Sequence, residues 1–156
     1  MLLTIRRVSR GLTNTHPALR QFWHPVVPEA DVPAAEPLAF TLLGERWLLV
    51  RVAGDLVAMR DRGPHRKVPI SQGKVIDDTL QCPYHGYRFG SDGRTTFIPS
   101  LDVDVPIPPK ACVDTAHVAV RFGFVWVCLA DEPLDDLLDD TGHLDPINDV
   151  FVAVTL

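Results

Sequence analysis

The chain of 156 residues is 46% hydrophobic and 22% charged, which allows one domain with a substantial core and excludes a compositionally disordered protein. Its formal net charge is −5, but eight of the twenty acidic residues lie after Ala130, where no Lys or Arg occurs. Residues 1–130 thus carry fifteen basic and twelve acidic residues, a net charge of +3 without a basic stripe, so nucleic-acid binding is not predicted.

No membrane-spanning or targeting segment is predicted either. The longest apolar run near the end of the body, residues 122–130, has nine residues, about half of what a transmembrane helix needs. The Arg-containing N-terminus lacks the apolar region and cleavage-like site of a secretory signal. Cys82, Cys112 and Cys128 are an odd number of cysteines and too few for a secreted disulfide framework, which predicts reduced thiols or metal ligands. We therefore expect a soluble, cytoplasmic protein.

The first half of the chain predicts a meander of short strands. Residues 1–37 form an N-terminal segment in which only Pro17–Trp23 is expected to be helical, with proline at its first turn. From residue 38 onward, apolar runs alternate with turn-forming pairs. The predicted strands there are Ala39–Leu43, Trp47–Val52 and Leu56–Arg60.

The second half continues the β pattern. Two loop segments, 61–73 and 81–93, are separated by two short predicted strands, and a hairpin closes the body. These four strands are Lys74–Ile76, Thr79–Gln81, His117–Arg121 and Phe124–Leu129. Both faces of the last strand are apolar, which predicts burial on both sides. The fold is therefore expected to be mostly β over residues 38–130, followed by an acidic tail, residues 131–156, with a short helix around residues 133–140.

Candidate metal ligands gather in the two loop segments. His65 lies in the first, and Cys82 and His85 form a Cys-x-x-His sequence in the second. Thiolate and imidazole groups on two neighbouring β-loops can supply soft and borderline ligands to one metal centre. A lone Cys or His is usually structural, but these three together predict a metal site.

The surrounding sequence resembles the Rieske domain of the Rieske non-haem iron, ring-hydroxylating oxygenases. That family has Cys-Pro-His and, after about sixteen residues, Cys-Pro-Tyr-His-Gly-Trp. Here Gly63-Pro64-His65 is followed, sixteen residues later, by Cys82-Pro83-Tyr84-His85-Gly86-Tyr87. The flanking sequences also match over residues 17–132, among them Phe22-Trp23-His24-Pro25, Asp61-Arg62, Pro69-Ile70-Ser71 and Ile98-Pro99-Ser100.

The resemblance implies a Rieske-type antiparallel β-sandwich whose two loops hold a [2Fe–2S] cluster. In such a centre two histidines bind one iron and two cysteines bind the other. By resemblance, His65 and His85 hold the outer iron and Cys82 is a ligand of the inner iron. Gly63 stands where the family has its first cysteine, so the cluster is expected to be labile or absent. Neither Cys112 nor Cys128 has a spacing that predicts a substitute.

The function implied is electron transfer from a reductase or ferredoxin to the non-haem iron of an oxygenase catalytic domain or subunit. That iron needs two histidines and a carboxylate, and neither Asp114 with His117 nor Asp140 with His143 is followed by a second histidine at suitable spacing. We therefore expect no catalytic iron site in this sequence. The tail, residues 131–156, is interpreted as the start of a missing or truncated catalytic domain.

Two alternatives remain open at the level of sequence. His65, Cys82 and His85 would be the ligands of a single zinc-like ion with an open fourth position. Alternatively, the chain would be a metal-free, non-catalytic remnant that acts as an interaction module.

Overall fold

The computed structural model describes residues 15–134, so residues 135–156 of the predicted acidic tail, with most of its expected short helix, lie outside the described part. Within it the chain forms short 3-10 helices and antiparallel strands. The helices are η1 (Pro17–Gln21), η2 (Glu29–Asp31) and η3 (Ile70–Gln72). The strands are β1 (His24–Pro28), β2 (Leu38–Leu42), β3 (Glu45–Val52), β4 (Asp55–Arg60), β5 (Lys74–Ile76), β6 (Thr79–Gln81), β7 (Arg88–Phe89), β8 (Thr95–Phe97), β9 (Thr115–Arg121) and β10 (Phe124–Cys128).

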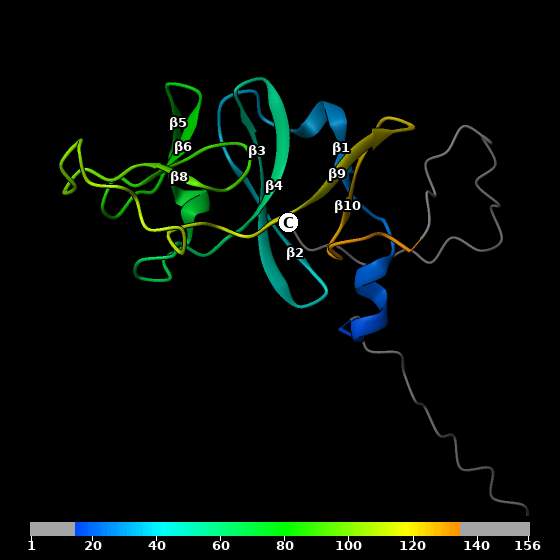
Figure 1. Ribbon diagram of the computed structural model, residues 1–156. Helices are drawn as coiled ribbons and strands as arrows, with labels where there is room; N and C mark the ends of the chain where they lie inside the picture. The colour runs from blue at the N-terminus through cyan, green and yellow to red at the C-terminus, as the bar shows by residue number, and fades with distance from the viewer. Residues whose placement is uncertain (1–14, 135–156) are drawn as a thin grey trace, which may run out of the picture.

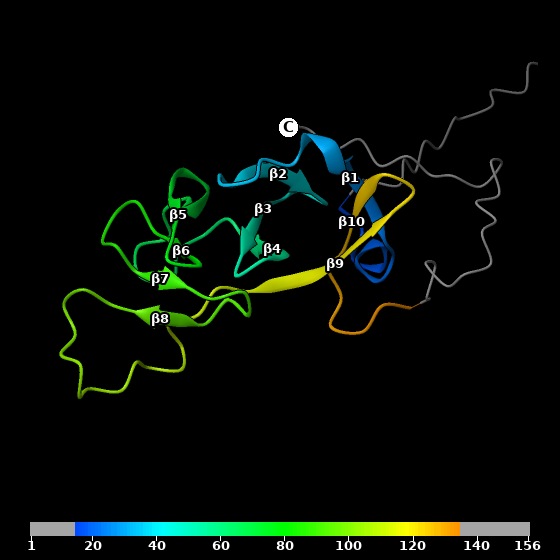
Figure 2. The same cartoon turned by 90° about the horizontal axis from the view of Figure 1, so that it is seen from above.

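The strands make two sheets, and the prediction of a mostly β, antiparallel fold is confirmed (Figure 1). The larger sheet has six strands in the order β1-β10-β9-β4-β3-β2, and the smaller has four in the order β5-β6-β7-β8. Seen from above, β5 to β8 lie at one end of the molecule and the β1–β10 pair at the other (Figure 2). In the described residues, no helix is long and apolar enough to cross a membrane.

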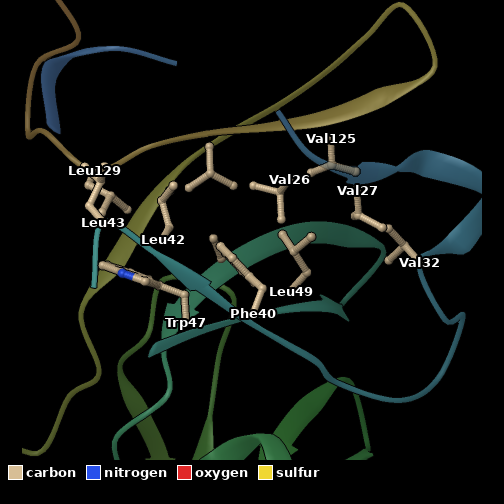
Figure 3. Close-up of a cluster of buried hydrophobic side chains, with 12 residues drawn as sticks. Val26, Val27, Val32, Phe40, Leu42, Leu43, Trp47, Leu49, Val125 and Leu129 are labelled. Carbon is tan, nitrogen blue, oxygen red and sulfur yellow. The ribbon is translucent and has the colours of Figure 1, made fainter. Parts of the chain in front are cut away.

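Strand β3 separates two hydrophobic cores, because alternate residues of a strand point to opposite faces. Trp47 and Leu49 pack into a core between β1, β10 and the β2–β3 hairpin, where the side chains point toward one another (Figure 3). Leu48 and Val50 pack into a second core beneath the smaller sheet, with Phe89. The smaller sheet and the two loops with the candidate ligands therefore pack against the face of β3 that is opposite the first core.

The sequence predicted most strands to within one or two residues, and Lys74–Ile76 and Thr79–Gln81 match β5 and β6. The expected N-terminal helix is a 3-10 turn that ends two residues earlier, at Gln21. Strand β1 was not predicted, because its two prolines argue against a strand. It pairs with β10 at the edge of the larger sheet, where proline is tolerated.

The prediction that both faces of the last strand are buried was wrong. Val125 and Val127 are fully buried, but on the other face Phe124 is 43% exposed and only Cys128 is buried. Trp126 on that face is partly exposed, and its indole N–H donates to the Arg121 carbonyl oxygen at 3.1 Å. The N-terminal segment covers only the Cys128 end of this face, where the Cys128 thiol donates to the Arg20 carbonyl oxygen and Trp23 lies edge-on to His117.

Candidate metal centre

Each of the two loops is closed by its own backbone hydrogen bonds. In the first loop, between β4 and β5, Gly63 N–H donates to the Val68 carbonyl oxygen at 2.8 Å and Lys67 N–H donates to that of Gly63 at 3.0 Å. In the second, between β6 and β7, Cys82 N–H donates to the Tyr87 carbonyl oxygen at 2.7 Å. Backbone hydrogen bonds thus close both loops.

A buried carboxylate anchors the first loop. The Asp61 side chain is fully buried, and its Oδ1 accepts from Ser71 N–H at 2.8 Å and its Oδ2 from the Ser71 hydroxyl at 2.9 Å. Arg46 of β3 also donates to Oδ2, at 2.9 Å. Asp61 therefore ties both ends of the loop to the larger sheet. Sequence reasoning noted it only as part of a flanking match, because its partners are ten and fifteen residues away.

The two predicted histidine ligands face each other. The Nδ1 atoms of His65 and His85 are 3.1 Å apart, and both side chains are exposed. Two nitrogens bound to one tetrahedral ion at about 2.0–2.1 Å would be separated by about 3.3 Å. Tyr87 stacks on His65 with ring planes 12° apart, and Tyr84 lies 3.9 Å from the His85 ring centre. The rings are therefore held where both Nδ1 atoms can bind one iron.

The local electrostatics favour neutral imidazole at this position. Partial desolvation, the neighbouring His85 ring and the Arg66 guanidinium together lower the pKa of His65 below its ordinary value. Neutral imidazole is the form that binds metal ions.

Behind the histidines, the structure brings the other predicted site residues to the same place. Cys82 is 8% exposed and packs in the second core, and Gly63 is buried. Both line a small pocket that His65 and His85 also line. The exposed imidazoles thus lie on the outer side of the pocket and the thiol on the inner side.

These residues fit a [2Fe–2S] cluster only in part. The two imidazoles needed by one iron are present, but the other iron needs two thiolates and the pocket contains one cysteine. Cys112 is exposed and forms an isolated bridge with Arg94. Cys128 donates its thiol to the Arg20 carbonyl oxygen at 3.3 Å in the larger sheet, and desolvation raises the pKa of that thiol. Neither cysteine lines the pocket, so the set is one thiolate short.

The same geometry bears on the single-ion alternative. Within residues 15–134, no three His, Cys, Asp or Glu side chains are close enough together to hold one metal ion. His65, Cys82 and His85 therefore share a pocket without forming a three-ligand site, and a single zinc-like ion gains no support from their placement.

Comparison with known proteins identifies the arrangement. Residues 22–112 match the model of the Rieske [2Fe-2S] domain family. The chain is 39% identical, over 116 residues, to the methylxanthine N1-demethylase NdmA of Pseudomonas putida, a match covering 71% of this chain and 33% of that protein. It is 37% identical, over 131 residues, to the chloroplastic chlorophyllide a oxygenase of Chlamydomonas reinhardtii, covering 81% of this chain and 20% of that protein.

Solved structures agree with the sequence matches. A mutant of Pseudomonas putida NdmA with theobromine superposes with a TM-score of 0.69 at 37% identity, over 75% of this chain and 36% of that one. Dicamba monooxygenase bound to dicamba gives a TM-score of 0.69 at 29% identity, over 78% of this chain and 36% of that one. The chain thus spans about a third or less of the length of these relatives, and the expected Rieske-type β fold is confirmed. With the family match extending over more than half of its residues, this chain belongs to the Rieske [2Fe–2S] domain family.

Proposed function

We propose that this chain is the electron-transfer domain of a Rieske-type oxygenase. It takes electrons from a reductase or ferredoxin and passes them to a non-haem iron in an oxygenase catalytic domain or subunit. The observation that carries the proposal is the pair of exposed, facing imidazoles of His65 and His85 in front of the buried Cys82. A Rieske cluster, when bound, carries one electron at a time at a potential raised by its histidine ligands.

The chain's own side chains support the assignment of His65, Cys82 and His85 as cluster ligands. Exposed histidine rings place one side of the site at the protein surface, where a redox partner can approach closely. Burial of Cys82 and Gly63 among apolar residues shields the other side from water. Backbone hydrogen bonds within each loop hold these groups in position.

The relatives support the proposed partners. They include the iron-sulfur subunit TsaM1 of the toluene-4-sulfonate monooxygenase system of Comamonas testosteroni, 33% identical, and the oxidoreductase NdmD of Pseudomonas putida, 34% identical. A role within a multi-component oxygenase system therefore suits this chain. Chloroplastic proteins are also among the relatives, so the cytoplasmic location stays a prediction, made from the reduced state expected of the three cysteines.

The Gly63 position limits this function, and it provides the test. We expect Gly63→Cys, purified anaerobically, to be red-brown with equal amounts of iron and sulfide and to accept one electron reversibly. The chain as it stands should bind far less cluster. The measurements are the visible absorption spectrum, the iron and sulfide contents and the electron paramagnetic resonance spectrum of the reduced protein.

Gly63→Ala is the matched control, because it adds the same Cβ without the sulfur. That Cβ would lie 3.3 Å from Ile70 Cγ2, so both variants need the same small adjustment of the loop. The Gly63→Ala protein should stay colourless. Failure of Gly63→Cys to hold a cluster, in a protein that folds normally by circular dichroism, would overturn the assignment of the site.

A further inference from the structure

Three basic side chains of the first loop lie at the surface with no carboxylate to neutralise them. Arg62, Arg66 and Lys67 are all exposed, and within the described residues none of their side chains forms an ion pair or a hydrogen bond. The one acidic residue of this loop, Asp61, is fully buried and paired with Arg46. The loop therefore presents uncompensated positive charge to solvent.

Most other arginines of the described residues are paired, and this contrast gives the loop charges their interest. Those that form an ion pair with a carboxylate are Arg20, Arg46, Arg60, Arg88 and Arg94. Unpaired charges of one sign repel one another, so they do not stabilise the loop by themselves. Arg66 also lines the pocket of His65 and His85, which places the positive charge directly beside the exposed imidazoles.

An exposed aromatic ring adjoins the same pair of imidazoles. Tyr84, in the second loop, is 59% exposed, and its ring centre lies 3.9 Å from that of His85. Tyrosine and arginine are enriched at protein–protein interfaces, and tyrosine provides a large contact area with a polar tip. The imidazole pair thus has an exposed aromatic ring beside His85 and unpaired basic groups beside His65.

We propose that Arg62, Arg66, Lys67 and Tyr84 form a donor surface, which docks a small acidic redox protein of the ferredoxin type. This inference rests on the proposed function, and it specifies the chemistry of the electron donor and the surface that the donor meets. Carboxylates of an acidic partner would neutralise the three unpaired cations at the place where the imidazoles are exposed.

The composition of the donor surface fits a transient complex. Electron-transfer partners meet through small interfaces, and complementary charge raises the rate of their encounter more than it raises their affinity. A permanent interface would need a large apolar area instead. Three exposed cations on one loop and a single exposed aromatic ring on the next match the first description.

The test is calorimetric titration of the full chain with an acidic plant-type [2Fe–2S] ferredoxin at low ionic strength and along a salt series. We expect Arg66→Glu to weaken binding on the order of tenfold, because a like charge then faces the partner's carboxylates. This difference should shrink as salt screens the charges. Tyr84→Ser should weaken binding at low and at high salt, since an apolar contact is not screened. Circular dichroism checks that each variant folds.

Arg121→Glu is the matched control, because it makes the same change of charge at another exposed position. Arg121 ends β9, which with β10 lies at the other end of the molecule from the smaller sheet (Figure 2). This variant should bind like the unaltered chain. Equal weakening by Arg66→Glu and Arg121→Glu would show that net charge alone drives binding, and it would overturn the donor surface. Equally tight binding of a single-stranded oligonucleotide would overturn the choice of partner.

Gly63→Cys separates failure of this inference from failure of the proposed function. Gly63 is buried and lies outside the donor surface, so ferredoxin should bind this variant and the unaltered chain alike. If Gly63→Cys holds a cluster but neither protein binds ferredoxin, the donor surface is wrong and the electron-transfer assignment stands. If Gly63→Cys holds no cluster, the assignment itself is wrong, and the inference that rests on it falls too.

Discussion

The two sheets of this domain are stabilised in different ways. The larger sheet has strands of five to eight residues and its own core, whereas strands of the smaller sheet have only two or three residues. Of the nine buried residues in the second core, four come from the larger sheet, namely Leu48, Val50, Val52 and Met59. The loops with the candidate ligands thus lie in a layer whose core depends on the larger sheet. Polar contacts such as those of Asp61 add stability that the short strands do not provide.

The strongest test of this comparison uses two adjacent leucines of β3. Leu48 and Leu49 are both fully buried, but they face the second and first cores respectively. Each change to alanine should lower the free energy of unfolding by about 2–5 kcal/mol, since it leaves a cavity in a packed core. Denaturant unfolding followed by circular dichroism measures both losses.

The two variants should differ in the loops. The amides of Gly63 and Cys82 are expected to exchange hydrogen faster in Leu48→Ala, because local opening of the smaller sheet becomes easier. In Leu49→Ala their local exchange should stay near that of the unaltered chain. Equal acceleration in both variants would show that the two layers open as one unit and that the comparison is wrong.

The features that could be predicted best from the sequence were the long, regular strands and the spacing of the candidate ligands. Strands β3 and β4 carry clear apolar patterns and turn residues at their ends, and the candidate ligands stand in a recognisable spacing. Strand β1 escaped prediction because its residues are rich in proline and its partner β10 lies about a hundred residues away, beyond any local signal. Strands β7 and β8 are too short for a period-two pattern.

The missed features of the site are of the same long-range kind. No local pattern indicates that the Asp61 carboxylate meets Ser71 and Arg46, since these groups come together only after β3, β4 and η3 have packed. Likewise, apolar residues on both faces of the last strand did not reveal which face is left partly exposed, at Phe124. The sequence spacing predicts His65, Cys82 and His85 as candidate ligands. Only the folded structure shows that they line one pocket.

An intermediate loss of stability is expected when the Asp61 carboxylate, which anchors the first loop, is replaced. Asp61→Asn keeps the size of the side chain but removes the charge that accepts from Arg46 and Ser71 in a fully buried position. We expect a loss of about 1–3 kcal/mol in the free energy of unfolding, because Ser71 and Arg46 lose a charged acceptor that lies in a buried position.

Asp92→Asn is the matched control. Asp92 pairs with Arg94 at 3.5 Å, but its side chain is 61% exposed, so removing its charge should change stability by less than about 1 kcal/mol. Denaturant unfolding of both variants in the same buffer makes the comparison. A loss for Asp61→Asn no larger than that for Asp92→Asn would mean that packing alone holds the first loop.

The smallest loss of stability is expected when Glu45, whose carboxylate links the N-terminal segment to the larger sheet, is replaced. Glu45 of β3 pairs with Arg20 of η1 at 2.9 Å and with Arg60 of β4, and Arg20 also donates to the Leu129 carbonyl oxygen. Partial burial works to raise the pKa of Glu45, but the hydrogen bonds and charges of the two arginines outweigh it, and the net pKa lies below its ordinary value.

A carboxyl group whose pKa is lowered by folding stabilises the protein above its unfolded-state pKa, and this contribution is lost as the pH falls through the folded-state pKa. We therefore expect Glu45→Gln to lower the free energy of unfolding by about 0.2–1 kcal/mol at neutral pH, with the difference shrinking in acid and in high salt. Unfolding curves of both proteins along a pH series measure it. Because the Glu45 side chain is 27% exposed and that of Asp61 is fully buried, this loss should be smaller than that of Asp61→Asn. A larger loss at Glu45 than at Asp61 would mean that charge contributes more to the larger sheet than to the first loop. A loss that persists in acid would mean that the Glu45 charge is not its cause.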